Sequence, residues 1–527
     1  MAVATAGLAG AQASAAPATA PSGGVPGAGE WPFAGQNLAN THSSPNEHKI
    51  STANASTLQP KWTVTTAGNV TATPTVFGGI VYFSDQGGML WAVNAETGSV
   101  VWSRAVSDLT GVAGDVSRPS PAISGNLLIT GDGWINGPGL TGGAKIFAVN
   151  RLTGKLVWST KVSDHPASTI TEAPVVFHGV VYVGVASKEE AISGNPAYQC
   201  CTFRGAVVAL DEHTGRILWK SYMIPSNNGG SDVNLPGGYS GDAVWGSSAV
   251  IDERRGLLYV GTGNNYTVPD GVCEVPGQTD CQPSAADNHT ESIMALRLRD
   301  GKVQWATRTT DADVFSGACL GTPQCGPDFD FGSGPNMFTT HDPATGKPRQ
   351  LIGIGQKSGI YWALDPNTGK VVWTTMVGPG SFLGGLEWGS ATDGKRIYVA
   401  EADALRIPYT LGGSGPFAGQ TTTGGSWAAL DPATGKVLWQ TPDPATQLDV
   451  AFTTVANGVM YGASTNTNGD NMFAIDAATG SILWSFDADG SITSGPAVVN
   501  GNVYWGSGYS FGPAGNSTKF YAFAPAQ

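Results

Sequence analysis

The chain is poor in charged residues. Only 13% of its 527 residues are Asp, Glu, Lys or Arg, and 27 basic residues stand against 40 acidic ones. No basic tract appears, which argues against nucleic acid as a partner. No apolar run is long enough for a transmembrane helix. Six cysteines are present, but no C-x-x-C or C-x-x-C-H motif occurs, so the chain carries no covalent c-type haem.

The first thirty residues are rich in Ala, Gly, Pro and Ser and have no charge before Glu30. The stretch "AQASAAPA" resembles the small-residue end of a secretory signal, although the basic start of such a signal is missing. We interpret residues 1–30 as a flexible leader or signal remnant, with a plain disordered tail as the alternative. Residues 31–527 are expected to form one domain.

The cysteines are expected to form local pairs. Cys273 and Cys281 bracket "EVPGQTD", and Cys319 and Cys325 bracket "LGTPQ", which are short polar loops suited to disulfides in an exported protein. Zinc is the alternative, but no His lies at ligand spacing. Two further cysteines are neighbours in "AYQCCTFRG". A disulfide between neighbours adds little loop-closure entropy, so another role for that pair has to be sought.

One pattern recurs along the chain: Ala-x-Asp/Asn-x-x-Thr-Gly-x-x-x-Trp. It ends, with the fourth copy the most degenerate, at Trp102, Trp158, Trp219, Trp305, Trp373, Trp439 and Trp484. The acidic or amide side chain and the Gly are typical of a tight hairpin turn. A second hairpin, of the type "TPTVFGGIVYF", precedes most copies. Each unit therefore supplies four short strands, which is the content of one propeller blade.

The two ends of the chain complement each other. The C-terminal segments "SGPAVVNGNVYWGSG" and "KFYAFA" supply three strands, and "LQPKWTV" near the N-terminus supplies a single strand with Trp62. We predict that this strand completes the last blade, giving an all-β, eight-bladed propeller without an exposed edge at the seam. A seven-bladed ring with stray ends and an open solenoid are the alternatives. The longest interval between repeats, Trp219 to Trp305, predicts a large insertion on a binding face.

The repeat resembles the tryptophan-docking motif of the pyrroloquinoline quinone (PQQ) dehydrogenases, from about Trp62 to Ala524. Within that family, "AYQCCTFRG", "GQKSGIYWALD" and "WPFAGQNLANTHSS" are similar to polyvinyl alcohol dehydrogenases. The resemblance implies PQQ and calcium as cofactors and oxidation of secondary alcohol groups, including those of polyvinyl alcohol. Some propellers with this repeat are only scaffolds, so the site residues must decide.

The resemblance also assigns roles to individual residues. It implies Trp245 as the floor under the quinone, Asp330 as the catalytic base, and Lys357 as the basic residue at the reactive quinone oxygens. It implies that the metal ligands are Glu190 (with Glu189 as its rival), Asn264 and Asp330. Gly332 stands where lanthanide-using relatives carry an extra Asp, which favours calcium. The resemblance or local chemistry places further cofactor contacts at Thr171, Arg118, Arg204, Cys200 and Cys201.

The chemistry of these residues is coherent without the family. Two carboxylates and an amide suit calcium, which takes hard oxygen ligands. Such a cation polarises a quinone carbonyl and keeps Asp330 ionised, so that Asp330 can accept the proton of a substrate hydroxyl. Lys357 can stabilise the developing negative charge. A ring formed by Cys200 and Cys201 is a flat apolar lid for a planar cofactor, or a strained turn without a ligand.

Each residue also has an ordinary structural interpretation. Trp245 fits a buried strand aromatic, and Asn264, Asp328 and Lys357 fit turns. A surface ion pair is the alternative for Arg118. The agreement of the set favours an enzyme over a scaffold. Small alcohols, polyols or sugars are the alternative substrates to a polymer. Without a haem motif, an external acceptor such as cytochrome c must take the electrons, and the disulfide pattern favours a secreted or periplasmic location.

Overall fold

The computed structural model describes residues 26, 27, 29–133, 140, 142–509 and 515–526. Most of the predicted leader, residues 1–25, lies outside the described residues. The described helices are short: η1 (Ala55–Thr57), α1 (Val106–Thr110) and α2 (Glu189–Ile192). None of them is long and apolar enough to cross a membrane. Strands make up nearly all of the remaining regular structure.

The strands form eight sheets, each with four antiparallel strands, which are the blades of a propeller; two of these sheets carry a fifth, two-residue strand. The first four blades, numbered along the chain, contain these strands: in blade 1, β3 (Thr75–Phe77), β4 (Ile80–Ser84), β5 (Met89–Asn94) and β6 (Val100–Ala105); in blade 2, β7 (Ala122–Ser124), β8 (Leu127–Gly131), β9 (Lys145–Asn150) and β10 (Leu156–Lys161); in blade 3, β12 (Val175–Phe177), β13 (Val180–Ser187), β14 (Ala206–Asp211) and β15 (Ile217–Tyr222); in blade 4, β17 (Val250–Asp252), β18 (Leu257–Gly261), β20 (Ser292–Arg297) and β21 (Val303–Arg308).

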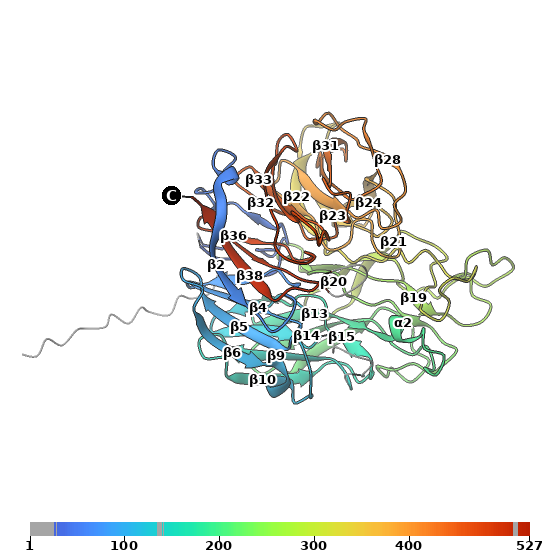
Figure 1. Ribbon diagram of the computed structural model, residues 1–527. Coiled ribbons are helices and arrows are strands. Elements are labelled where there is room, and N and C mark those ends of the chain that lie inside the picture. Colours follow the sequence, from blue (N-terminus) through green and yellow to red (C-terminus); the bar gives the residue numbers. More distant parts are fainter. Residues whose placement is uncertain (1–25, 28, 134–139, 141, 510–514, 527) are drawn as a thin grey trace, which may run out of the picture.

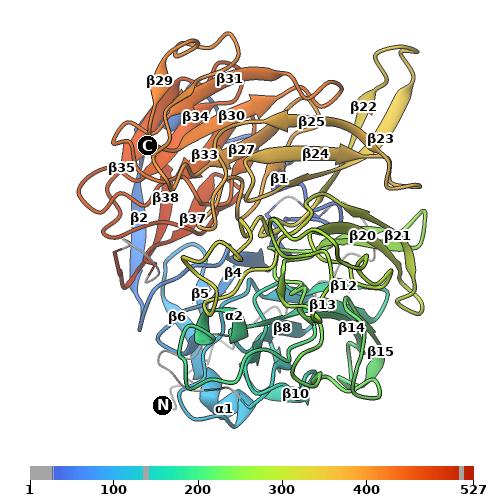
Figure 2. The ribbon, with the colours of Figure 1, turned by 90° about the vertical axis from the view of Figure 1, so that its right-hand side faces the viewer.

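The other four blades continue in chain order around the ring, as the colours in Figures 1 and 2 show. They contain these strands: in blade 5, β22 (Asn336–His341), β23 (Pro348–Gly355), β24 (Ile360–Leu364) and β25 (Val371–Met376); in blade 6, β26 (Ala391–Thr392), β27 (Ile397–Glu401), β30 (Ser426–Leu430) and β31 (Val437–Pro442); in blade 7, β32 (Thr454–Ala456), β33 (Val459–Ala463), β34 (Met472–Asp476) and β35 (Ile482–Phe486); in blade 8, β36 (Ala497–Val499), β37 (Asn502–Gly506), β38 (Lys519–Pro525) and β2 (Leu58–Thr65).

Six two- or three-residue strands lie beside or between the blades: β1 (Ser43–Ser44), β11 (Ser168–Thr169), β16 (Ser240–Gly241), β19 (Asn265–Thr267), β28 (Tyr409–Thr410) and β29 (Thr421–Thr422). Of these, β16 pairs with β19 and β28 pairs with β29. The pair β16–β19 belongs to the long insertion between Trp219 and Trp305.

The closure predicted from the sequence is confirmed. Strand β2 pairs with β38 in an antiparallel register from Leu58–Pro525 to Thr65–Lys519, and Figure 1 shows β2 (blue) beside β38 (red). Blade 8 is therefore built from both ends of the described chain. The alternatives of seven blades and of an open solenoid are wrong, because β2 occupies the edge that either would leave exposed.

The recurring motif couples each blade to the next. In blade 6, Asp431 Oδ1 accepts hydrogen bonds from the backbone N–H of Ala433 and Thr434, each at 2.9 Å. Gly435 follows at φ +75°, and a Cβ there would lie 2.4 Å from the Trp373 ring of blade 5. Only glycine fits both the backbone angle and the approach of the indole. The Trp373 indole N–H then donates to the Pro432 carbonyl at 3.2 Å.

All eight blade junctions contain such a tryptophan, whose indole N–H donates to a carbonyl of the following blade at 2.8–3.2 Å. The donors are Trp62, Trp102, Trp158, Trp219, Trp305, Trp373, Trp439 and Trp484. The junction at the seam differs, because Trp484 donates to Leu58, the first residue of β2. The buried apolar residues lie mainly between neighbouring blades, in clusters such as that of Phe83, Val93 and Phe520.

The segment from Trp31 to Ser44 crosses the innermost strands, and its last two residues form β1, which pairs in parallel with β32 of blade 7. Trp31 bridges to Val76 in β3, and the Pro32 carbonyl accepts from Ile123 in β7. Carbonyls of residues 38, 39, 41 and 42 then accept from β17, β22, β26 and β32 at 2.8–3.0 Å. This strap therefore ties together the inner strands of six blades.

Candidate functional site

A pocket lies where the innermost strands begin. Its lining comes from the segments just before the inner strands of seven blades: Thr71, Ala72, Arg118, Pro119, Ser120, Thr171, Trp245, Ser247, Trp388, Phe452 and Thr493. Those inner strands are neighbours around the ring, so the pocket lies on the propeller axis. Three aromatic side chains, those of Trp245, Trp388 and Phe452, line it together with several polar groups. Aromatic and polar groups converging in a concave site are typical of a cofactor pocket.

Asp330 is the hub beside this pocket. Its Oδ2 accepts the indole N–H of Trp245 at 2.8 Å, and its Oδ1 accepts the backbone N–H of Asn264 at 2.7 Å. The Lys357 Nζ lies 3.7 Å from Asp330 Oδ2 and 5.1 Å from the centre of the Trp245 ring. The predicted floor, base and basic residue are thus brought together. Each comes from a different loop, between residues 242–249, 326–335 and 356–359.

Two further carboxyl groups gather at one side of Asp330. Glu190, Asp328 and Asp330 each offer an oxygen, and these oxygens lie within 4.8 Å of one another. Lys357 Nζ forms an ion pair with Asp328 at 3.0 Å. Burial raises the pKa of Asp328, and burial and the Asp330 charge raise the pKa of Glu190 to about 8. Burial alone would lower the pKa of Lys357, but the surrounding carboxylates raise it well above its ordinary value.

The donor set fits a hard cation. The Asn264 amide N–H₂ donates to Asn265 and Phe315 carbonyls at 3.0 and 2.7 Å, which turns its Oδ1 away from them. That Oδ1 is buried and accepts no hydrogen bond from the described residues. Carboxylate and amide oxygens are what calcium prefers, and neither cysteine sulfur nor imidazole belongs to the cluster.

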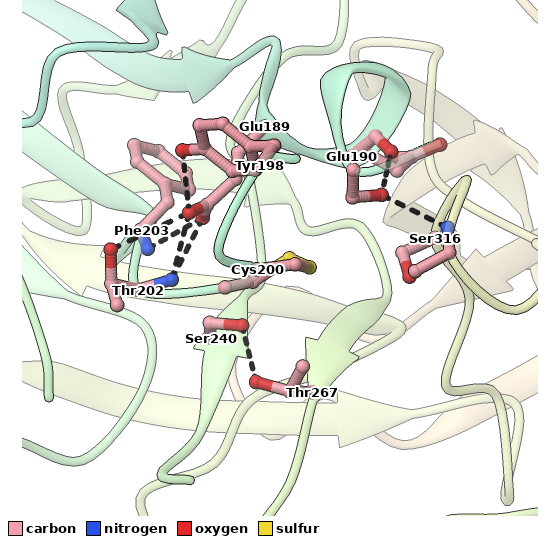
Figure 3. The surroundings of a disulfide bond; sticks show 12 residues. Glu189, Glu190, Tyr198, Cys200, Thr202, Phe203, Ser240, Thr267 and Ser316 are labelled. Atoms are coloured by element: carbon pink, nitrogen blue, oxygen red, sulfur yellow. Dashed lines mark hydrogen bonds between the residues drawn. A yellow bond between two sulfur atoms is a disulfide. The ribbon is translucent and has the colours of Figure 1, made fainter. Parts of the chain in front are cut away.

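The two adjacent glutamates have different surroundings. Glu189 accepts hydrogen bonds from the Tyr198 hydroxyl and from the backbone N–H groups of Thr202 and Phe203, at 2.7–3.0 Å. Figure 3 shows these groups around Glu189, with Glu190 on the turn of α2. Burial would raise the pKa of Glu189, but bonds from His165 and this backbone outweigh it and lower the pKa. Glu190, not Glu189, joins the acidic cluster.

Cys200 and Cys201 form a disulfide with each other. Cys201 is buried and Cys200 is half-buried. Cys201 belongs to an apolar cluster against which Cys200 and Trp245 pack. Glu189 accepts hydrogen bonds from the backbone N–H groups of the next two residues, Thr202 and Phe203. The two local pairs, Cys273–Cys281 and Cys319–Cys325, are also disulfides, as expected.

The remaining predicted contacts separate into two groups. Thr171 and Arg118 line the pocket; the Thr171 hydroxyl donates to the Trp245 carbonyl at 3.2 Å, and the Arg118 guanidinium lies 4.4 Å from the Trp388 ring centre. Arg204 is not part of the lining. Its guanidinium donates to the carbonyls of Ser231 and Ile224 at 2.6 and 2.9 Å. These two bonds hold a loop, while the buried Nε–H of Arg204 has no hydrogen-bond partner among the described residues.

Two features of the site were missed from the sequence. Asp328 was interpreted as a turn residue, and its backbone does have φ +60°, but its side chain pairs with Lys357. Trp388 meets Trp245 edge to face at 5.4 Å between ring centres. A weak signal for Trp388 exists: "WGS" directly precedes an inner strand at Trp245 and Trp388, but it also occurs at Trp505 within β37.

Family models match most of the chain. The model described as "Glucose/ethanol/alcohol dehydrogenase, beta-propeller domain" matches residues 161–392. The model described as "Outer membrane protein assembly factor BamB" matches residues 3–198 and 423–520. The two matches together cover the repeats from both ends of the ring.

The individual relatives of the chain are alcohol dehydrogenases, in agreement with the description of the first family model. The chain is 30% identical to a polyvinylalcohol dehydrogenase of Pseudomonas sp, over 93% of this chain and 74% of that protein. It is 33% identical to a polyvinylalcohol dehydrogenase of Sphingopyxis sp. (strain 113P3), over 72% of this chain and 54% of that protein. The crystal structure of quinohemoprotein alcohol dehydrogenase from Comamonas testosteroni has the same fold, with a TM-score of 0.69 and 20% identity over 94% of this chain and 80% of that one.

Proposed function

Because the chain belongs to the PQQ-dependent quinoprotein alcohol dehydrogenase family, we propose that it oxidises secondary alcohol groups, those of polyvinyl alcohol in particular. One observation carries the proposal: Asp330 is held between Trp245 Nε1 and Asn264 N, beside Lys357 and next to the axial pocket. A scaffold propeller has no need to bury a base, a cation and a ring of carboxyl groups at one point, since unpaired buried charge is costly.

The cofactor contacts follow from the lining of the pocket. Trp245 offers a flat floor, and Arg118 offers donors to an acidic quinone. The Thr171 hydroxyl donates its proton to the Trp245 carbonyl and so presents an acceptor oxygen at the pocket wall. The ring of Cys200 and Cys201 is the proposed lid, since it packs with the same apolar cluster as Trp245. PQQ supplies, when bound, an electrophilic carbonyl carbon that accepts a hydride.

The metal ligands are proposed to be Glu190, Asn264 and Asp330, with Asp328 as a fourth oxygen donor. Calcium suits the proposal because all four residues present hard oxygen atoms. Lys357 supplies one positive charge against several clustered carboxyl groups. A cation bound here would balance the remaining negative charge. It also favours the ionised form of Asp330, which the reaction requires of a base.

Asp330 is the proposed general base. The two hydrogen bonds from Trp245 and Asn264 occupy one lone pair on each oxygen and fix the plane of the carboxylate. A substrate hydroxyl can then donate its proton to a remaining lone pair of Asp330, while the carbon that bears this hydroxyl gives up its hydride. Lys357 Nζ is held by an ion pair with Asp328 at 3.0 Å. Its positive charge would stabilise the negative charge that develops on the reactive quinone oxygen.

Polyvinyl alcohol is proposed as the substrate because the two relatives with 30% and 33% identity bear that name. Small alcohols are the second candidate, since quinohemoprotein alcohol dehydrogenases also match, at 27% identity. An external acceptor such as cytochrome c is proposed to take the electrons. Three disulfides support a secreted or periplasmic location.

The proposal is tested with the full chain supplied with PQQ and calcium and assayed with a dye acceptor on polyvinyl alcohol and on small alcohols. We expect Asp330→Asn to lower kcat by roughly 10²- to 10⁴-fold, since an amide cannot take up the substrate proton. Asn keeps only one of the two acceptor oxygens, so the melting temperature is measured alongside to show that the variant is folded. Asp311→Asn, at a side chain that is 93% exposed, is the matched control. Full activity of Asp330→Asn would refute the assignment of Asp330 as the general base. Activity on small alcohols alone would refute the polymer as substrate.

A further inference from the structure

The acidic cluster is bordered by an irregular loop that the proposed reaction does not use. Residues 313–326 lie between β21, which ends at Arg308, and β22, which begins at Asn336, and they contain no strand or helix. Asp313 at the base of the loop is 1% exposed, whereas Leu320 at its tip is 57% exposed. Long irregular segments in a compact domain are often functional. The buried base of this one therefore calls for an explanation.

Two links close this segment on itself. The Cys319–Cys325 disulfide joins its outer part. At its base, the Gly326 N–H donates to the Val314 carbonyl at 2.7 Å. A disulfide removes conformations that the open chain could otherwise adopt. Residues 313–326 are therefore named the Cys319–Cys325 loop, a unit whose backbone is fixed although it has no regular structure.

The Cys319–Cys325 loop orients the side chain of Asn264. The Phe315 carbonyl accepts a hydrogen bond from Asn264 Nδ2 at 2.7 Å, and the Phe315 N–H donates to the Asn265 carbonyl at 2.9 Å. A side-chain amide has its donors on nitrogen and its acceptor on oxygen, so an acceptor at Nδ2 turns Oδ1 the other way. That Oδ1 is buried and accepts no hydrogen bond from the described residues. It is thus available to a cation.

The same loop holds the backbone of Glu190. The Gly317 N–H donates to the Glu190 carbonyl at 2.9 Å, and the Ala318 N–H donates to Ser193 Oγ at 3.1 Å. The two segments lie very close together, because a Cβ on Gly317 would be 2.7 Å from the Gly194 backbone nitrogen. Only a residue without a side chain permits this approach. The Cys319–Cys325 loop therefore fixes the turn that carries Glu190.

A third contact comes from Asp313. Its two carboxylate oxygens accept the backbone N–H groups of Asp328 and Phe329, each at 2.8 Å. Hydrogen bonds to an ionised carboxylate are stronger than those between neutral groups. Asp328 and Phe329 directly precede Asp330. The Cys319–Cys325 loop thus bonds to all three segments that carry the proposed metal ligands.

We propose that the Cys319–Cys325 loop is a positioning clamp for the metal ligands, which keeps their oxygen atoms arranged for a cation before the cation binds. The inference deepens the proposed function and rests on the metal site of Glu190, Asn264 and Asp330 proposed there. Carboxylates held close together repel one another, so the empty site needs a rigid frame. A site arranged in advance binds more tightly, because binding no longer includes the ordering of its groups.

The test measures calcium binding to the full chain without quinone or alcohol, so that catalysis does not enter the result. Chelator-stripped protein is titrated with CaCl₂ in equilibrium dialysis, and the cofactor-site calcium is the one that Glu190→Gln removes. Cys319→Ser/Cys325→Ser keeps all the ligands but opens the loop. We expect it to raise the Kd for that calcium by at least about tenfold, the range found when groups that orient metal ligands are changed.

The second local disulfide provides the matched control. Cys273→Ser/Cys281→Ser removes a bridge that also closes a short loop. Among the described residues, neither cysteine nor the residues between them form a hydrogen bond with a proposed metal ligand. This variant should therefore bind calcium with the Kd of the parent protein. An equal loss in both double variants would show that disulfides stabilise the fold in general, and would overturn the clamp.

A glycine pair decides the question if Cys319→Ser/Cys325→Ser does not fold. Gly317→Ala keeps the disulfide but pushes the loop away from Gly194, and it should also raise the Kd about tenfold. Gly321→Ala, at the tip with no heavy atom within 4 Å of the added Cβ, should leave the Kd unchanged. The clamp is overturned if Gly317→Ala binds calcium as tightly as the parent. If the parent binds no calcium that Glu190→Gln removes, the proposed metal site itself is wrong, and the clamp with it.

Discussion

Two neighbouring residues, Glu189 and Glu190, have opposite surroundings although the sequence presents them as equals. Glu189 holds the loop of Thr202 and Phe203, and Glu190 joins Asp328 and Asp330. We expect Glu190→Gln to raise the calcium concentration for half-maximal activity by more than about tenfold, since a ligand charge is lost. The measurement is a calcium titration of activity with excess PQQ.

Glu189→Gln is the matched variant, one residue away. It loses acceptors for charge-assisted hydrogen bonds and should cost about 1.5–3 kcal/mol of the free energy of unfolding. The calcium requirement of the folded variant should stay close to that of the parent protein. A raised calcium requirement in Glu189→Gln, with none in Glu190→Gln, would reverse the assignment of the two residues.

The buried carboxyl group of Glu172 predicts that the free energy of unfolding depends on pH. It is 2% exposed, and burial raises its pKa to about 8 although the Gly184 N–H donates to it. In the unfolded chain the same carboxyl titrates at about 4.3. Between these values the folded state holds a proton that the unfolded state has released. The contribution of Glu172 to stability is therefore fully present below the unfolded pKa and is lost as pH rises toward 8, by at most about 1.4 kcal/mol per unit.

The variant Glu172→Gln has no such proton to lose. We expect its free energy of unfolding, relative to the parent protein, to be higher at pH 8.5 than at pH 5.5. Denaturant unfolding of both proteins at both pH values measures this difference. An unchanged difference would mean that the carboxyl group is already ionised in the folded protein at pH 5.5.

At the scale of the element, the hairpin turn of each repeat is also the docking surface for the previous blade. Gly435→Ala would place a Cβ 2.4 Å from the Trp373 ring at a residue with φ +75°. The strained backbone angle and the overpacking together should cost about 2–4 kcal/mol. The melting temperature and the denaturant midpoint measure this loss.

Gly394 provides the control for this variant. It has φ +78°, but its added Cβ would have no heavy atom within 4 Å. Gly394→Ala should therefore cost only the backbone strain, about 1–2 kcal/mol. Equal losses in the two variants would show that the indole moves aside and that docking does not require glycine.

The strands and turns were predictable from the sequence because each repeat contains the residues that determine its own hairpin turn. The Asp or Asn, the Gly and the Trp of a repeat specify a turn and its contact, so the blades and their number followed from counting. The acidic cluster was only partly predictable. Glu190 and Lys357 lie in loops within blades 3 and 5, and Asp328 lies in the loop between blades 4 and 5. Their contacts depend on loop conformations that no local pattern encodes. The same holds for Arg204, whose bonds to Ser231 and Ile224 arise from an insertion without repeats.

At the scale of the whole molecule, stability depends on closing the ring. Strand β2 contributes its pairing with β38, the docking of Trp62, and the Leu58 carbonyl that accepts from Trp484. The strap from Trp31 to Ser44 adds bonds to six inner strands. Both devices come from the N-terminal part of the described chain, so successive N-terminal deletions separate their contributions.

We expect deletion of residues 1–25 to leave the melting temperature unchanged, since none of these bonds involves them. Deletion of residues 1–47 removes the strap and should lower the melting temperature while leaving one cooperative transition. Deletion of residues 1–66 also removes β2, which exposes the edge of β38 and should cause association through that edge. Calorimetry and light scattering measure the two effects. A monomeric, cooperatively unfolding protein after the last deletion would show that seven blades and a three-stranded remnant close the ring without β2.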